Sequence, residues 1–285
     1  MRPWLRAERE GSGGVDQQHI TVDGQRIAFA QSAGTERPVI LVHGNSSSAR
    51  TWGPVLAGPF GQRFRCLALD LPGHGDSAKA ASPADYSLPG YAAALTGFAR
   101  ATDAADAVIV GWSLGGHIAL EAAPALPAAA GFVVFGTPPV GSAAQLAEAF
   151  LPNPAMNVGF TAEVSAEDAR TFAGSFTTAG SALPLDDFVA DILLTDGDAR
   201  ANLLASVGEG RFTDEIAIVA ALQRPLAILQ GEGEQLVSLD YINKLTIPSL
   251  WRGAVQLIPD AGHAPHQEAP EAFTALLAQF TADLT

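Results

Sequence analysis

The sequence predicts an α/β protein whose central sheet is mostly parallel, flanked by helices and interrupted by an inserted helical cap. Short apolar runs alternate with helical patterns along most of the chain, which is typical of a doubly wound sheet. The run Pro38–Val42 is apolar at every position, as expected of a parallel strand that is covered on both faces. The alternation ends near Pro138 and resumes at Pro225, so the segment between them must be organised differently.

The expected elements follow one another in a regular order. Two alternating runs, His19–Val22 and Gln25–Ala30, flank Asp23-Gly24, a residue pair that favours a tight hairpin. Further strands are expected at 38–42, 64–69, 107–110, 132–135, 226–230 and 254–258. Helices are expected between the strands at about 49–58, 88–101, 114–123, 239–245 and 268–281.

The interrupting segment, residues 138–222, is too long to be a loop without structure of its own. Ser165-Ala166-Glu167-Asp168 resembles a capping box, and Thr213-Asp214-Glu215-Ile216 marks a second helix start. We therefore predict a helical cap over the carboxyl edge of the sheet, with the core formed by 17–137 and 223–285. Residues 1–16, which include Gly11-Ser12-Gly13-Gly14, are predicted to be a flexible extension.

Composition and charge exclude several functions. Of the 285 residues 48% are hydrophobic and 16% charged, so a folded core is expected. The net charge of −14, without any run of Lys or Arg, argues against nucleic-acid binding and against anionic membranes. The sequence has no signal-peptide core and no apolar stretch of membrane-spanning length, so we expect a soluble, cytoplasmic protein. The single cysteine, Cys66, lies in an apolar run and is expected to be buried and inert.

One pentapeptide predicts the chemistry. Gly111-Trp112-Ser113-Leu114-Gly115 is the only G-x-S-x-G in the chain, and it falls between an apolar strand and a helix. A strained turn at such a junction presents a nucleophilic serine, and the flanking glycines let the two backbones approach closely. We predict Ser113 as the nucleophile.

A serine hydroxyl needs a general base within hydrogen-bond distance. Among six histidines, His263 follows the last predicted strand, at the sheet edge that carries Ser113, and His266 is its only rival. The others lie elsewhere: His43 and His74 in loop motifs where they are expected to hold turns, His117 on the helix after Ser113, and His19 before the core.

The third member should be an acid that fixes the imidazole tautomer. It is expected after the penultimate strand, and Glu234 is the preferred candidate by its place in that loop. Glu232 and Asp240 remain alternatives. The chain order serine, acid, histidine matches the order in enzymes that use a G-x-S-x-G turn.

The oxyanion hole is expected from backbone N–H groups of Asn45, which follows an earlier strand, and Leu114. No H-x-H-x-D-H, H-E-x-x-H or cysteine-rich ligand set occurs, so no metal and no cofactor are expected. A small-molecule ester or lactone is the expected partner. The substrate-pocket candidates are Trp112, Met156, Phe172 and Phe176, and the cap also offers Phe150, Phe160 and Phe188, each of which can instead pack between cap and core.

Six motifs resemble those of the α/β-hydrolase N-acylhomoserine lactonases of the AidH type, over nearly the whole chain after residue 17. They are His43–Ser48, Leu69–Gly75, Gly111–Ile118, Gly136–Val140, Thr195–Gly197 and Ala261–Pro265. The resemblance implies the α/β-hydrolase fold, with Ser113, His263 and Glu234 as the catalytic triad. It also implies metal-independent ring opening of a quorum-sensing lactone.

The chain departs from the pattern of these lactonases at two positions. Gly233 stands where such acid loops tend to carry an acidic residue, and Phe172 stands where a tyrosine is expected near the active site. The missing hydroxyl would alter substrate hydrogen bonding.

Two other functions fit the same residues. A general carboxylesterase or another lactonase would use the same triad and differ only in the shape of its pocket. A signal-binding receptor would hold the ligand and hydrolyse it slowly, a behaviour that an intact triad disfavours. Dehalogenases and epoxide hydrolases place Asp where this chain has Ser113.

Overall fold

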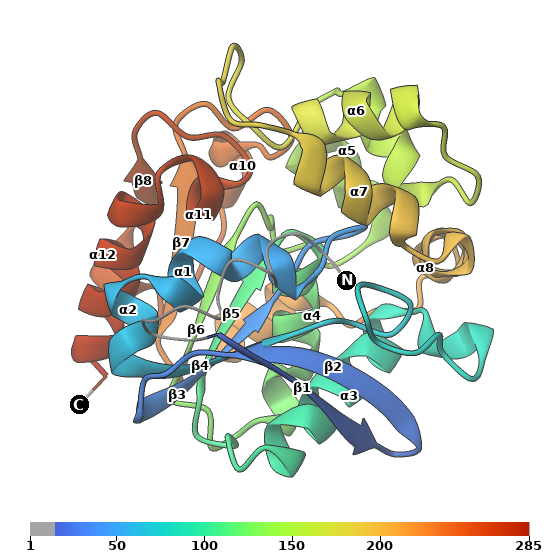
Figure 1. Cartoon of the computed structure of the whole chain (residues 1–285). Coiled ribbons are helices and arrows are strands. Elements are labelled where there is room, and N and C mark those ends of the chain that lie inside the picture. The colour runs from blue at the N-terminus through green and yellow to red at the C-terminus, as the bar shows by residue number, and fades with distance from the viewer. Residues whose placement is uncertain (1–14, 285) are drawn as a thin grey trace.

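The computed structural model describes residues 15–284, built around one eight-stranded sheet of order β1-β2-β4-β3-β5-β6-β7-β8 (Figure 1). The first strands pair antiparallel, and every pair from β4 onward is parallel. The strands are β1 Asp16–Val22, β2 Gln25–Gln31, β3 Glu36–Val42, β4 Phe64–Leu69, β5 Val108–Trp112, β6 Gly131–Phe135, β7 Leu226–Gly231 and β8 Gln256–Ile258.

The predicted hairpin is confirmed at the start of the sheet. Val22 pairs with Gln25, and the two residues between them have the positive φ angles that this turn requires, 48° at Asp23 and 84° at Gly24. The extension predicted at 1–16 lies almost entirely outside the described residues, although Asp16 already belongs to β1.

Two groups of helices cover the sheet, on opposite faces (Figure 1). One group packs together as α1, α2, α11 and α12, and the other as α3, α4 and α9. Their bounds are α1 Gly53–Ala57, α2 Pro59–Arg63, α3 Leu88–Ala101, α4 Leu114–Ala122, α9 Glu215–Ala221, α10 Leu239–Ile242, α11 Pro265–Glu268 and α12 Pro270–Ala282. The helix predicted at 49–58 is divided into a 3₁₀ turn, Ala49–Trp52, and α1, and the helix predicted at 268–281 follows the separate α11. Helices α1, α2, α11 and α12 each carry a proline in the first turn, where the missing N–H costs nothing.

A helical insertion, residues 138–222, separates β6 from β7 and contains no strand. Its remaining helices are α5 Leu146–Ala149, α6 Ala166–Gly174, α7 Asp186–Leu194 and α8 Gly197–Gly208. The predicted capping box is present at the start of α6, where the side chains of Ser165 and Asp168 each accept a hydrogen bond from the other residue's backbone N–H. The Asp214 side chain caps α9. Figure 1 shows α5–α8 as a separate layer beside the sheet. None of the described helices is long and apolar enough to cross a membrane.

At the junction of β5 and α4 the backbones lie so close together that no side chain fits between them. A Cβ added to Gly115 would lie 2.2 Å from the carbonyl oxygen of Val42 in β3, and one added to Gly111 would lie 2.3 Å from the carbonyl oxygen of Gly115. The backbone of a central strand is fixed by its neighbours in the sheet and cannot move to admit a Cβ. These two glycines therefore set the distance between α4 and the sheet.

We predict that Gly115→Ala destabilises the protein by about 3 kcal/mol, because α4 must shift off β3 to admit the methyl group. Gly208→Ala, in α8, is the matched control: no atom beyond the neighbouring helix backbone lies within 4 Å of its added Cβ, and the substitution should stabilise by about 0.5 kcal/mol. Urea unfolding of both variants checks this. Equal stability of the two would contradict the packing argument.

Candidate active site

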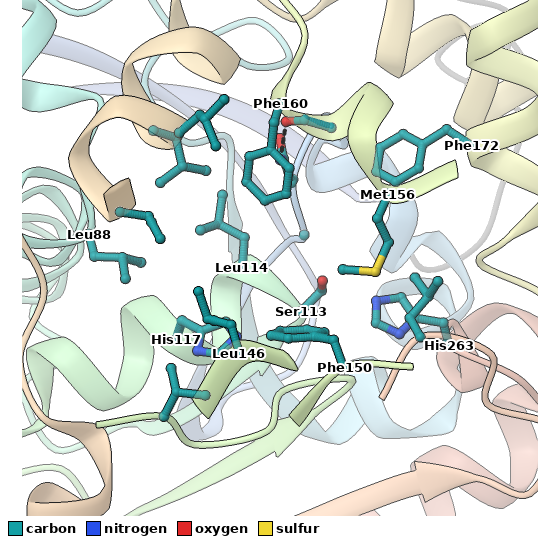
Figure 2. Close-up of a pocket in the computed structure, with 18 of the residues that line it drawn as sticks. Leu88, Ser113, Leu114, His117, Leu146, Phe150, Met156, Phe160, Phe172 and His263 are labelled. Atoms are coloured by element: carbon teal, nitrogen blue, oxygen red, sulfur yellow. Dashed lines mark hydrogen bonds between the residues drawn. The ribbon is translucent and has the colours of Figure 1, made fainter. Parts of the chain in front are cut away.

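Ser113 occupies a strained turn between β5 and α4. Its φ of 54° and ψ of −119° lie outside the regions that side-chain-bearing residues favour. The turn is held by a hydrogen bond from the Ser113 N–H to the Phe135 carbonyl (2.8 Å) and by the Thr137 hydroxyl, which donates to the Ser113 carbonyl (2.9 Å). The Ser113 hydroxyl faces the central cavity (Figure 2).

His263 lines the same cavity, and its orientation is set by a carboxylate. Its Nδ1 lies 2.8 Å from Glu234 Oε2, and both side chains are only 2% exposed. The other oxygen, Glu234 Oε1, accepts the backbone N–H of Leu236 at 2.7 Å. Because Nδ1 is held by Glu234, Nε2 is the ring nitrogen that this contact leaves free.

Two further contacts position the imidazole. Trp112 Nε1 donates to the His263 carbonyl oxygen at 2.8 Å, which ties the histidine loop to the strand that carries Ser113. Gly136, with a φ of 61°, leaves room for the ring: an added Cβ would lie 2.6 Å from His263 Cε1.

The other acids considered for this position point to solvent. Glu232 and Asp240 are exposed, whereas the Glu234 side chain is buried against His263. The geometry therefore favours Glu234. Gly233 is closely packed, since a Cβ there would meet Thr178 Oγ1 at 2.2 Å, so this chain has no space for the acidic residue of the lactonase pattern.

The other buried histidines make structural hydrogen bonds within the core and its loops. His43 Nε2 accepts the Leu71 N–H at 3.0 Å, and His74 Nδ1 lies 3.0 Å from the Pro72 carbonyl oxygen, so both hold turns as predicted. His266 is bound to the Thr51 hydroxyl through Nε2 (2.7 Å) and packs against Trp52 and other aromatic rings. This places His266 in the core rather than in the cavity.

Asn45 and Leu114, the expected oxyanion donors, both line the cavity. Leu114 is the first residue of α4, so its backbone N–H has no acceptor within the helix. The Asn45 side chain donates to the Gly159 carbonyl in the helical insertion at 2.6 Å. This bond anchors the loop after β3 to the insertion.

The cavity has a volume of about 560 Å³ and walls that are mostly apolar. All four predicted pocket residues, Trp112, Met156, Phe172 and Phe176, line it, as do Phe150 and Phe160. Phe188 does not; it packs behind the wall, with ring centroids 6.1 Å from Trp112 and 5.5 Å from Phe176. Helix α8 contributes a further wall that the sequence did not indicate, formed by Leu203, Leu204 and Val207.

Sequence reasoning also missed a polar member of the cavity wall. His117 lies one helical turn after Ser113 and is paired with Glu215, 98 residues away in the sequence. The spacing of four residues on α4 was an available signal for His117. No local pattern pointed to Glu215.

Neither metal ligation nor cysteine chemistry is indicated in the part of the chain that the structure describes. Residues 15–284 contain no group of three or more side chains able to hold a metal ion. Cys66 is buried, and burial raises the pKa of its thiol to about 12.

The Alpha/beta hydrolase family model matches residues 39–276, most of the chain. The chain belongs to this family. The 2-succinyl-6-hydroxy-2,4-cyclohexadiene-1-carboxylate synthase of Enterobacter sp. is 30% identical over 85% of this chain and 90% of that protein. Proteins of Mycobacterium tuberculosis and Mycobacterium bovis are 40% identical over 110 residues, which are 39% of this chain but only 31% of theirs.

Solved structures of N-acyl homoserine lactonase AidH are similar to this alpha/beta hydrolase. They superimpose with a TM-score of 0.90 at 37% identity, over 95% of this chain and 99% of the AidH chain in one case. Three of the AidH structures are complexes: two of AidH variants, with N-hexanoyl homoserine lactone and with N-hexanoyl homoserine, and one of AidH with N-butanoyl homoserine. Sequence and structure thus agree in placing the chain among the alpha/beta hydrolases.

We predict that Glu234→Gln lowers kcat by roughly three to four orders of magnitude, because a neutral amide neither fixes the His263 tautomer nor stabilises its protonated form. Glu232→Gln, two residues away and exposed, should stay within about twofold of the unmodified enzyme. Ester hydrolysis by the two variants, with circular dichroism to verify folding, measures the difference. A larger loss from Glu232→Gln would reverse the assignment.

We predict that acid weakens the fold. Burial lowers the pKa of His43 to about 3 and that of His74 to about 4, and burial together with His263 lowers the pKa of His266 well below its usual value. These three histidines bind protons only on unfolding, so their stabilisation is present above pH 6.5 and is lost as the pH falls below it. Burial raises the pKa of Asp70 to about 7, which opposes them, since its contribution is lost as the pH rises through 7.

The net expectation is a loss of about 3 kcal/mol in unfolding free energy between pH 6.5 and pH 5. Urea unfolding at both values measures it. In His266→Gln the fall should be about half as large, because one histidine no longer titrates while a hydrogen bond to Thr51 is retained. Stability that stays level or rises on acidification would contradict the prediction.

Proposed function

We propose that this alpha/beta hydrolase opens the lactone ring of N-acylhomoserine lactones, and so degrades quorum-sensing signals, through an acyl-enzyme on Ser113. The observation that carries the proposal is the hydrogen bond of 2.8 Å between His263 and Glu234, at a cavity that Ser113 also lines. The similarity to AidH at 37% identity, across the insertion as well as the core, supports the substrate class.

In the proposed mechanism His263 Nε2 removes the Ser113 proton while Ser113 Oγ attacks the lactone carbonyl carbon. The backbone N–H groups of Asn45 and Leu114 stabilise the oxyanion that develops, a contribution typically worth about 3 kcal/mol per donor. The intermediate collapses by breaking the ring C–O bond, and His263 returns its proton to the leaving alkoxide. Water, activated by the same imidazole, then cleaves the acyl-enzyme and releases an N-acylhomoserine.

Glu234 acts in this cycle by fixing Nδ1 of His263 and by stabilising the imidazolium that forms during both acylation and deacylation. The pair is 2% exposed, so the attraction between carboxylate and imidazolium is stronger than it would be in water. The reaction as proposed uses no metal and no cofactor.

The helical insertion, residues 138–222, acts in this proposal as a cap that holds the acyl chain. Met156, Phe172 and Phe176 give the chain an apolar wall in the cavity that Ser113 lines, and Leu203 and Val207 of α8 add to that wall. Such surfaces bind a chain through the hydrophobic effect, at about 0.8 kcal/mol for each buried methylene in the ideal limit.

A general carboxylesterase, or a lactonase of other substrates, is the second candidate. It is favoured by the side chain at 172, since a phenylalanine gives the acyl amide no hydroxyl to bind. The triad chemistry would be the same, and only the preference among esters would differ.

We expect N-acylhomoserine lactones to be hydrolysed with a higher kcat/KM than p-nitrophenyl esters of matched chain length. The value should rise by up to about fourfold for each added methylene until the cavity is full. Mass spectrometry would follow the gain of one water molecule, and turnover counts would exclude a slowly hydrolysing receptor.

The matched control is Ser113→Ala, which should fold normally and lose activity by several orders of magnitude. More than a tenth of the original kcat in this variant would overturn the nucleophile assignment. If p-nitrophenyl esters are hydrolysed rapidly while every acylhomoserine lactone stays intact, the protein is an esterase and the lactonase proposal is wrong.

A further inference from the structure

Two histidines line the cavity, and each is paired with a buried carboxylate behind it: His263 with Glu234, and His117 with Glu215. His117 Nδ1 lies 2.8 Å from Glu215 Oε1 and 3.0 Å from Oε2, so the ring faces the carboxylate squarely. The Glu215 side chain is completely buried, and that of His117 is 13% exposed. The mechanism proposed above uses neither residue.

Glu215 is held rigidly where α9 begins. Its Oε2 accepts the Val140 N–H at 2.9 Å, and its own backbone N–H donates to the Val140 carbonyl at 3.0 Å. Because the carboxylate accepts hydrogen bonds, the proton of a neutral His117 resides on Nδ1. The second nitrogen, Nε2, then carries a lone pair, and no other residue of the described chain hydrogen-bonds to it.

Among the polar side chains of the cavity wall in the described residues, only His117 has a ring nitrogen with no part in the proposed reaction and no hydrogen-bond partner. The polar side chains that line the cavity, apart from the tryptophan, are Asn45, Ser113, His117 and His263. Asn45 donates to Gly159, and Ser113 and His263 are assigned to the reaction. An apolar pair would join α4 to α9 without the cost of burying a carboxylate, so a purely structural role leaves this choice of residues unexplained.

The position of His117 fits one part of an acylated substrate. The His117 N–H donates to the Ser113 carbonyl oxygen at 3.3 Å, so His117 follows Ser113 by one helical turn, and both side chains line the cavity. In an N-acylated lactone the amide nitrogen is two bonds, or about 2.5 Å, from the carbonyl carbon that Ser113 attacks. Figure 2 shows Ser113 and His117 in the same region of the cavity, so an N–H group this close to the scissile carbonyl can lie on the side of His117.

We propose that His117 Nε2 accepts a hydrogen bond from an N–H group next to the scissile carbonyl, and that the cavity thereby selects N-acylated lactones and esters. His117 is thus a specificity-determining residue, and Glu215 a positioning residue that fixes its tautomer. The proposal rests on the proposed function for the place of the carbonyl at Ser113. It also supplies a polar contact to the amide in a chain that has Phe172 in place of a tyrosine.

The test compares substrate pairs that differ only in this N–H. One pair is N-hexanoyl homoserine lactone and its analogue with a methylene in place of N–H. The other is the p-nitrophenyl ester of N-hexanoylglycine and the corresponding methylene analogue. The quantity measured is the ratio of kcat/KM within each pair.

The decisive variant is His117→Asn, because the asparagine amide can still donate to Glu215 while Nε2 is gone. The ratio should fall about tenfold, mainly through KM for the N–H substrate. His117→Gln, whose side-chain oxygen reaches the place of Nε2, should restore part of the preference. His19→Asn, on exposed β1, is the matched control and should leave the ratio unchanged.

The outcomes separate this inference from the proposed function. An unchanged ratio in a folded His117→Asn variant, verified by its thermal unfolding midpoint, would overturn the inference and reduce His117 to a link between α4 and α9. No preference for N–H in the unmodified enzyme would overturn it as well. If no lactone is opened but the ester pair responds to His117→Asn, the lactonase proposal fails and the inference stands.

Discussion

The close contact between α4 and the sheet is the constraint on which the rest of the site depends. Gly111 and Gly115 allow backbone to lie against backbone, and the chain can pass from β5 to α4 only through the strained conformation of Ser113. Such a conformation costs on the order of 1–3 kcal/mol and persists because the surrounding structure enforces it. Its effect is to present the hydroxyl in the cavity and the first N–H groups of α4 beside it.

The partners of Ser113 come from loops that the parallel sheet brings to one edge. β7 leads to Glu234 and β8 to His263, while the loop after β6 supplies the glycine that makes room for the imidazole. Trp112 then ties the histidine loop to β5 by a hydrogen bond of 2.8 Å. Because each position is fixed by backbone contacts on a buried sheet, the imidazole and the carboxylate are oriented before any substrate binds.

The helical insertion is joined to the core by polar contacts around the cavity. Arg50 lies 2.7 Å from Asp191 on α7, and Ser48 donates to the same carboxylate at 2.7 Å. Asn45 donates to Gly159 from the loop that also supplies a proposed oxyanion donor. The apolar wall of the cavity and the loop after β3 are thus connected through side-chain hydrogen bonds.

The sequence by itself determined the class of fold, the hairpin at Asp23-Gly24, most strands and the strained turn at Ser113. These depend on local patterns: periodicity, turn residues, and glycines at a strand–helix junction. The sequence already preferred Glu234 to Glu232 and His263 to His266, and the buried contact between Glu234 and His263 agrees with both preferences. The position of Phe188 behind the wall and the pairing of His117 with Glu215 were decided by tertiary structure alone. The reason is that each depends on which segments distant in sequence meet around the cavity, and on which side chains are buried where they meet.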